Sequence, residues 1–190
     1  MVRVLVVVAD GSEEMETVIC VDVLRRAQIE VTLASVGAQV VTCSRNVRLH
    51  ADAQLNLSDS DFDAVVLPGG LGGAKAFAEN AALHTLLKAF ESKGKLVAAV
   101  CAAPIALHPA NIAKGKQITS HPSVKDQLVA ANWFGEYKED RVVVDGNLIT
   151  SRGPGTSFEF ALSIIKYLCG KEKAEEVAGP MVLPPGTIIV

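Results

Sequence analysis

Short, almost wholly apolar runs alternate with helix-like stretches along this chain, and this alternation restricts its fold more than any other feature. The first run, Val2–Val8, contains Arg3 as its only polar residue, which is typical of a parallel strand covered on both faces. Further strands are expected at Ile29–Val36, Phe62–Leu67 and Lys95–Val100. Helices are expected from the N-cap Ser12 to about Ala27, and from the glycine-rich segment 68–73 to about Ser92. The alternation predicts an α/β sandwich around a mostly parallel sheet.

The second half of the chain adds an expected antiparallel edge to this sheet. Val142–Val144 and Leu148–Thr150 flank Asp145-Gly146, a pair typical of a tight hairpin turn. A closing helix is expected over Ser157–Leu168, with Gly170 ending it. The polar stretch Val40–Ser60 allows only short strands. Because the chain shows neither an internal repeat nor a low-complexity linker, residues 1–190 are predicted to form a single domain.

Composition narrows the classes of partner and compartment. The net charge of −3 argues against a nucleic-acid partner and against an anionic membrane surface. No apolar run reaches the length of a membrane span, and the N-terminus lacks the regions of a signal peptide, so the cytoplasm is the predicted location, with the nucleus left open. The four cysteines and four histidines are scattered without metal-ligand spacing. Free thiols are expected, and no metal site.

The segment Leu96–Pro104 contains the first candidate for chemistry. An apolar strand reaches Cys101 and a helix-compatible segment follows, which is typical of a sharp strand-to-helix turn with the turn residue lifted out. Ala99 and Ala103 supply the small side chains that such a turn needs. A cysteine beside a helix N-terminus would be favoured as a thiolate. Pro109 is expected to end or kink this helix around 107–110. A buried structural cysteine is an equally good interpretation of the segment alone.

The glycine-rich loop Pro68–Gly73 follows another predicted parallel strand. Because the carboxyl ends of parallel strands lie at one edge of a sheet, this loop and Cys101 are expected to be neighbours. Glycine would let backbone N–H groups face a developing oxyanion. The alternative is a turn that merely requires glycine.

Glu16 shares a helical stripe with the apolar positions Cys20, Val23 and Ala27, so its carboxyl is expected to be partly buried. A buried carboxyl keeps its proton because burial disfavours the charged form. It could then donate a hydrogen bond to a thiolate or carry a proton. Taken without any family pattern, the residue is better explained as a surface glutamate. The same helix is apolar almost all round, which indicates a subunit interface.

His121 lies in Thr119-Ser120-His121-Pro122, a loop expected at the end of a short strand. An imidazole at such a position can serve as a base or as the partner of a thiolate. The sequence leaves open whether Asp22, another residue or no group orients this imidazole.

Six segments together resemble the DJ/ThiJ/PfpI superfamily. They are Asp10–Val18, Thr42–Arg45, Leu67–Gly70, Ala99–Pro104, His121–Asp126 and Thr150–Phe160. These matches extend from the first strand to the closing helix, and the last of them is long and distinctive.

The resemblance implies a flavodoxin-like three-layer sandwich, a nucleophile elbow at Cys101 and a homodimer. Transferred position by position, it makes Cys101 the nucleophile, Glu16 its protonated hydrogen-bond partner and His121 the nearby imidazole. Oxyanion or substrate contacts fall to the N–H groups of Gly70 and Ala102. The remaining positions carried over as lining the site are Arg45, Arg152 and Pro154.

The expected activity is that of a glutathione-independent glyoxalase. Small α-oxoaldehydes, methylglyoxal and glyoxal, would be converted to lactate and glycolate through a hemithioacetal on Cys101, without a cofactor. Deglycase action on aldehyde already added to protein or nucleotide groups is a related reaction that the sequence does not separate from the first. The alternative is a redox sensor or chaperone of the oxidative-stress response, acting through oxidation of Cys101.

Overall fold

A seven-stranded sheet forms the centre of the structure, a computed structural model that describes residues 1–56, 61–187 and 189–190. Its strand order is β10-β11-β7-β6-β1-β2-β5. The strands are β1 (Arg3–Val8), β2 (Glu30–Ser35), β5 (Ala53–Gln54), β6 (Ala64–Leu67), β7 (Leu96–Val100), β10 (Val142–Asp145) and β11 (Leu148–Ser151). All neighbours pair in parallel except β10, which runs antiparallel to β11. The predicted α/β class and the predicted edge hairpin are therefore confirmed.

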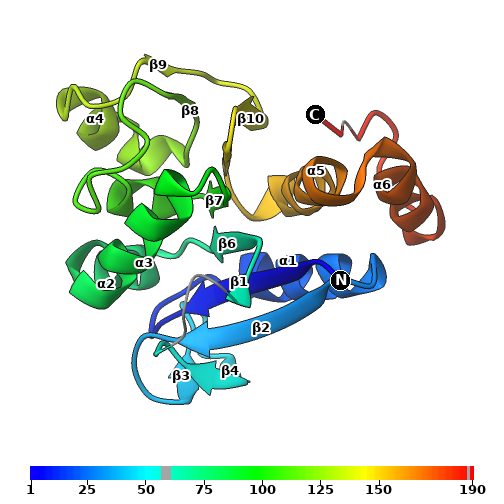
Figure 1. Ribbon diagram of the computed structural model, residues 1–190, viewed down its shortest axis with the longest axis horizontal. Coiled ribbons are helices and arrows are strands. Elements are labelled where there is room, and N and C mark those ends of the chain that lie inside the picture. The colour runs from blue at the N-terminus through cyan, green and yellow to red at the C-terminus, as the bar shows by residue number, and fades with distance from the viewer. Residues whose placement is uncertain (57–60, 188) are drawn as a thin grey trace.

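Helices cover both faces of this sheet (Figure 1). Three lie on one side: α2 (Leu71–Glu79), α3 (Ala81–Ser92) and α4 (Pro122–Ala130). Three lie on the other: α1 (Glu14–Arg26), α5 (Ser157–Cys169) and α6 (Lys171–Ala178). Among the residues described, no helix is long and apolar enough to span a bilayer.

The alternation of side chains along β1 divides the core into two layers. Leu5 and Val7 pack into the apolar cluster beneath α2 and α3, whereas Val4, Val6 and Val8 pack into the cluster beneath α1 and α5. All five are fully buried, which explains why this strand is apolar throughout. Cys101, directly after β7, contacts both clusters.

The predicted helix boundaries are wrong at two places, Ser12 and Asn80, and hydrogen bonds between side chains and the backbone explain both. Ser12 is not the N-cap of α1, because its Oγ accepts the Ala9 N–H at 3.1 Å and Glu13 takes the cap position. The expected single helix after the glycine loop is divided into α2 and α3. Asn80 separates them: its side chain accepts the Leu83 N–H at 2.8 Å and starts a new helix.

The segments outside the main sheet are short. β3 (Val40–Thr42) pairs with β4 (Arg48–His50), and β8 (Gln117–Ile118) pairs with β9 (Glu136–Tyr137). The first pair lies within the polar stretch 40–60, of which residues 57–60 fall outside the described part. Directly after Cys101 the chain forms the 3-10 helix η2 (Ala103–Ala106), which is shorter than the helix that the sequence predicts there.

Candidate active site

A cavity of about 450 Å³ opens at the carboxyl ends of β1, β6, β7 and β11. This is the edge at which open parallel sheets bind ligands. Its lining residues are Gly11, Glu13, Ser44, Arg45, Gly70, Leu71, Gly72, Cys101, Ala102, His121, Ser123 and Pro154. The cavity thus brings together six residues predicted from the sequence: Arg45, Gly70, Cys101, Ala102, His121 and Pro154.

Cys101 occupies a sharp turn with φ of 63°, a left-handed conformation that non-glycine residues rarely adopt. Hydrogen bonds on both sides hold it there. Its N–H donates to the Ser151 carbonyl at 3.0 Å, and its carbonyl accepts the His121 N–H at 2.8 Å. Backbone strain maintained in this way is typical of functional positions, and here it presents the sulfur to the cavity.

Gly69 and Gly70 bring the neighbouring loop against this turn. A Cβ on Gly69 would lie 2.4 Å from the Cβ of Cys101 and 2.8 Å from Oε2 of Glu16, so any side chain there would displace both groups. Gly70 has φ of 81°, and a Cβ there would lie 2.3 Å from the Gly11 carbonyl oxygen. This close approach lets the N–H groups of Gly70 and Ala102 donate toward the Cys101 sulfur.

Glu16 lies behind the sulfur and is fully buried on α1. Its Oε2 accepts the Gly69 N–H at 2.7 Å, whereas Oε1 is buried without a hydrogen-bond partner among the described residues. Burial raises the pKa of this carboxyl to about 7, against the lowering effect of the Gly69 N–H. Burying an oxygen without a hydrogen-bond partner costs far less free energy when the oxygen carries a proton than when it belongs to a charged carboxylate. The geometry therefore favours a proton on Oε1.

Burial also raises the pKa of the Cys101 thiol, to about 12, and the negative charge of an ionised Glu16 raises it further. The lowered pKa expected from a helix N-terminus is therefore not found. The four residues of η2 lack the dipole of a full α-helix, and only the N–H groups of Gly70 and Ala102 lower the pKa of the thiol. When Glu16 holds its proton the repulsion disappears, so the protonation of these two groups is coupled.

His121 is the N-cap of α4 and lines the cavity. Its Nδ1 lies 2.8 Å from Oγ and 3.2 Å from the N–H nitrogen of Ser123. In the described part of the chain no carboxylate bonds to this ring. Asp22, one of the acids left open as its partner, instead pairs with Arg26 at 2.7 Å on α1.

The two arginines carried over from the family pattern are placed differently. Arg45 lines the cavity and donates from its guanidinium to the Ser44 carbonyl at 3.1 Å. Arg152 does not line the cavity, because its guanidinium is bound to the carboxylate of Glu139 at 2.8 Å and to the carbonyl of the same residue.

Sequence reasoning did not find every lining residue. Glu13 shows nothing in the sequence that distinguishes it from other acids near a helix start, yet its Oε2 accepts the Ser44 hydroxyl at 2.7 Å across the cavity wall. Ser123 was not singled out at all. The available signal was its position two residues after His121, within reach of the imidazole at a helix start.

The other thiols are poor candidates for the same chemistry. Cys20 and Cys43 are both buried, and neither lines the cavity. Cys169 is exposed and lies at the end of α5, away from the cavity lining. The described residues contain no group of three or more acidic, histidine or cysteine side chains that could hold a metal ion.

Comparison with known proteins identifies the family of this chain. Residues 2–167 match the DJ-1/PfpI family. The chain is 53% identical over 176 residues to protein dj-1beta of Drosophila melanogaster, covering 92% of this chain and 93% of that protein. It is 49% identical over 184 residues to the Parkinson disease protein 7 homolog of Danio rerio, covering 95% and 97% of the two chains.

A more distant relative bears a name that states an activity. The chain is 35% identical over 175 residues to the glutathione-independent glyoxalase DJR-1.2 of Caenorhabditis elegans, covering 92% of each protein. Among solved structures, that of Drosophila melanogaster DJ-1beta superposes with a TM-score of 0.92 at 51% identity, covering 96% of this chain and 98% of the other. From the family match, the relatives and the shared fold, it follows that this chain belongs to the DJ-1/PfpI family.

Proposed function

We propose that this protein is a glutathione-independent glyoxalase that converts methylglyoxal to lactate and glyoxal to glycolate. The observation that supports this most strongly is that the Cys101 sulfur and two backbone N–H groups meet at one cavity, with the fully buried Glu16 carboxyl behind the sulfur. A nucleophile, an oxyanion site and a proton carrier are the parts that the reaction requires.

The first step forms a carbon–sulfur bond. The Cys101 thiol gives its proton to the ionised form of the Glu16 carboxyl as the sulfur adds to the aldehyde carbon, and the π electrons of the carbonyl move to its oxygen. The N–H groups of Gly70 and Ala102, which already point at the sulfur, stabilise the resulting oxyanion until it is protonated to the hemithioacetal.

The second stage moves a proton between adjacent carbons. Removal of a proton from the carbon that bears sulfur, with protonation of the neighbouring carbonyl oxygen, gives an enediol. Return of a proton to that neighbouring carbon, with loss of the proton from the hydroxyl on the sulfur-bearing carbon, gives a thioester. Glu16 is the proton carrier, because its raised pKa of about 7 lets it both accept and release a proton near neutral pH. Water then cleaves the thioester and restores the thiol. The net change is addition of one water to methylglyoxal, so no redox partner is needed.

The test is lactate formation from methylglyoxal in glutathione-free buffer. Cys101→Ser is expected to lower kcat/KM by at least about 10³-fold, because a serine hydroxyl is a much weaker acid and a much weaker nucleophile than a thiol. Cys169→Ser is the matched control, since that thiol lies outside the cavity lining, and it should retain wild-type activity. Full lactate formation by Cys101→Ser would refute the proposal.

Deglycase activity is a separate question about the same site. We expect free methylglyoxal to be consumed faster than a preformed adduct of methylglyoxal with N-acetylarginine, because the cavity of about 450 Å³ suits a small aldehyde. If the adduct were consumed faster than it releases aldehyde spontaneously, the protein would act on adducts directly.

A redox-responsive role is the second candidate, and it is favoured by the position of Cys101 in the cavity lining. Cys101 is the cysteine that lines the described cavity, beside the N–H groups and the carboxyl that would stabilise a sulfinate. Intact-mass analysis under mild peroxide tests it. Addition of two oxygens at Cys101, with Cys20, Cys43 and Cys169 unchanged, would support sensing, whereas random oxidation would refute it.

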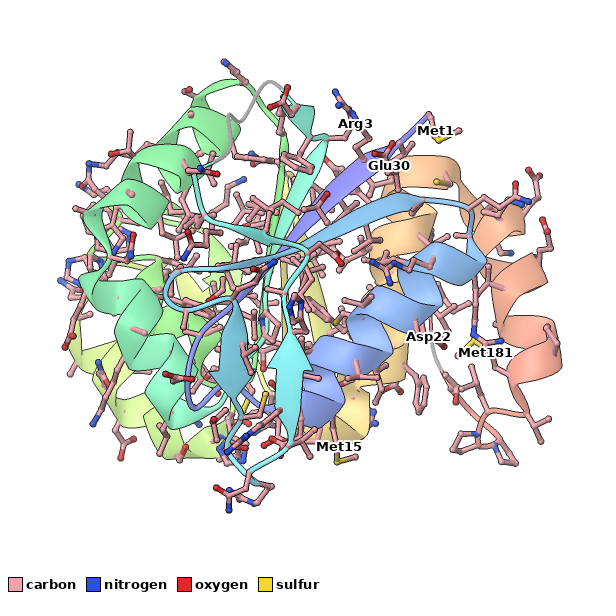
Figure 2. All side chains as sticks on the ribbon, turned by 90° about the horizontal axis from the view of Figure 1, so that it is seen from below. Met1, Arg3, Met15, Asp22, Glu30 and Met181 are labelled. Atoms are coloured by element: carbon pink, nitrogen blue, oxygen red, sulfur yellow. The ribbon has the colours of Figure 1, made fainter. Side chains whose placement is uncertain are left out.

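We further propose a homodimer and a cytoplasmic location. The dimer is supported by the outer side of α1, where Met15 and Val18 are about half exposed. Figure 2 shows Met15 at the rim of the molecule, at the beginning of α1.

A further inference from the structure

Ser123 contacts the imidazole of His121 through two atoms. Its backbone nitrogen lies 3.2 Å from Nδ1 and its Oγ lies 2.8 Å from the same atom. Both residues line the cavity, and Ser123 is the second residue of α4. The serine is therefore placed where it can determine which ring nitrogen carries the proton.

The backbone contact decides the direction of these hydrogen bonds. A backbone N–H at a helix N-terminus can only donate, so Nδ1 must present its lone pair to Ser123. A neutral imidazole has one acceptor nitrogen, and its proton therefore lies on Nε2. The Ser123 hydroxyl can then donate to the same lone pair. A proton on Nδ1 would instead point toward the serine N–H.

The tautomer limits what His121 can do in the reaction. With Nδ1 occupied by the helix start, Nε2 is the ring nitrogen left for a substrate. An Nε2–H group donates a hydrogen bond and does not accept a proton. The His121 backbone N–H donates to the Cys101 carbonyl at 2.8 Å, and this hydrogen bond holds His121 next to the turn that carries the nucleophile.

We propose that Ser123 is a positioning residue that holds His121 as a neutral Nε2–H donor to the substrate oxygen, leaving proton transfer to Glu16. This inference rests on the proposed glyoxalase function for its catalytic part. Its structural part, the tautomer, stands on the two contacts alone.

The tautomer is measured by long-range ¹H–¹⁵N NMR of protein labelled at histidine nitrogens, at about pH 9, where an imidazole is neutral. The His121 signals are assigned by their loss in His121→Gln. Wild type and Ser123→Thr, which keeps the hydroxyl, should show the proton on Nε2. Ser123→Ala keeps the backbone N–H that donates to Nδ1 and loses the hydroxyl, so its Nδ1–H fraction should rise while Nε2–H remains the main tautomer. A wild-type protein with its proton on Nδ1 would overturn the proposal.

Kinetics separate a donor from a base. His121→Gln retains an N–H group near the position of Nε2, whereas His121→Asn retains only an acceptor near the position of Nδ1. If Nε2–H donates, kcat should fall on the order of 10-fold in His121→Gln and on the order of 100-fold in His121→Asn, the usual range for loss of one such donor. Equal losses would overturn the donor role, because neither amide is a base.

The serine itself is tested by the pair Ser123→Ala and Ser123→Thr. Alanine should lower kcat several-fold with little change in KM, and threonine should restore it. Ser92→Ala, which removes an exposed hydroxyl near the end of α3, controls for a general effect of losing a helix hydroxyl. Equal tautomer and kcat in wild type and Ser123→Ala would overturn the positioning role. If no variant forms lactate, the proposed function fails, and the NMR result alone then supports or overturns the role of Ser123.

Discussion

Glu16 and Gly69 are joined by a 2.7 Å hydrogen bond in which the glycine N–H donates to Oε2 of the buried carboxyl. The bond occupies one carboxyl oxygen and leaves Oε1 without a partner among the described residues. A Cβ on Gly69 would lie 2.8 Å from Oε2, so the close approach of this hydrogen bond requires glycine at position 69. The carboxyl is thus held with one oxygen bound and the other available for a proton.

Glu16→Gln should change how stability depends on pH. The pKa of this carboxyl is about 7 in the folded protein and 4.5 as a reference. The folded state therefore keeps a proton that the unfolded state has lost, and the stabilisation is full below pH 4.5 and lost as pH rises to 7. The difference between wild type and Glu16→Gln should shift against wild type by about 3 kcal/mol across this range.

Urea unfolding at pH 4.5, 6 and 8 measures this difference. Glu30→Gln is the control, because Glu30 is an exposed carboxylate at the start of β2, beside Arg3 (Figure 2). A pH-independent difference between wild type and Glu16→Gln would show that the carboxyl titrates normally.

Gly69→Ala should disturb the site and the fold together. The added methyl group would lie 2.4 Å from the Cβ of Cys101, which forces the turn or the loop to move. We expect a loss of about 1–3 kcal/mol in the free energy of unfolding, as for other overpacked interiors. Gly37→Ala meets nothing within 4 Å and should be nearly neutral by the same urea titration. Equal stability of the two variants would contradict the close packing.

Arg141→Ala should destabilise the protein by leaving a buried carboxylate without its cation. The Arg141 guanidinium contacts both oxygens of Glu159, at 2.8 and 2.9 Å, and the Glu159 side chain is only 8% exposed. Because Arg141 is itself 56% exposed, we expect a cost of about 1–3 kcal/mol, below that of a fully buried pair. Adding Glu159→Gln should recover part of it, as measured by a double-mutant cycle in urea. Additive effects would show that the pair does not interact.

Val18→Asp should weaken the proposed homodimer. Val18 is 48% exposed on the outer side of α1, and a partner subunit that covers it would bury a new charge. We expect the dissociation constant to rise by at least about 10-fold, measured by light scattering over a dilution series. Val129→Asp, at an equally exposed valine on α4, should leave the oligomer unchanged. A monomeric wild type would refute the dimer.

The fold was predictable wherever the sequence pattern had a single physical explanation. Val4 to Val8 contain no polar residue, and such a strand must be covered on both faces. The helix boundary at Asn80 was missed because the apolar period continues across it, while a local side-chain bond interrupts the backbone. Likewise, the turn at Ser12 uses the serine hydroxyl one step before the helix, which spacing alone does not reveal.

The residues that form the site were easier to predict from the sequence than their pKa values and ion pairs. Cys101 and Gly70 could be placed at one sheet edge because both follow parallel strands, whereas His121 was placed near them by the family resemblance; the structure puts all three around one cavity. The raised pKa of Cys101 follows from burial and from the proximity of Glu16, and neither is available before the chain is folded. The ion pair that draws Arg152 to Glu139 is equally a product of tertiary packing.

Cys101 touches both apolar layers, since its side chain packs against the cluster beneath α2 and α3 and against the one beneath α1 and α5. A group attached to the sulfur must therefore be accommodated by the two halves of the interior at once. The melting temperature of the protein should therefore depend on which group is bonded to the Cys101 sulfur. Any adduct on that atom, whether an aldehyde carbon or an oxygen, should register as a shift in the unfolding of the entire chain.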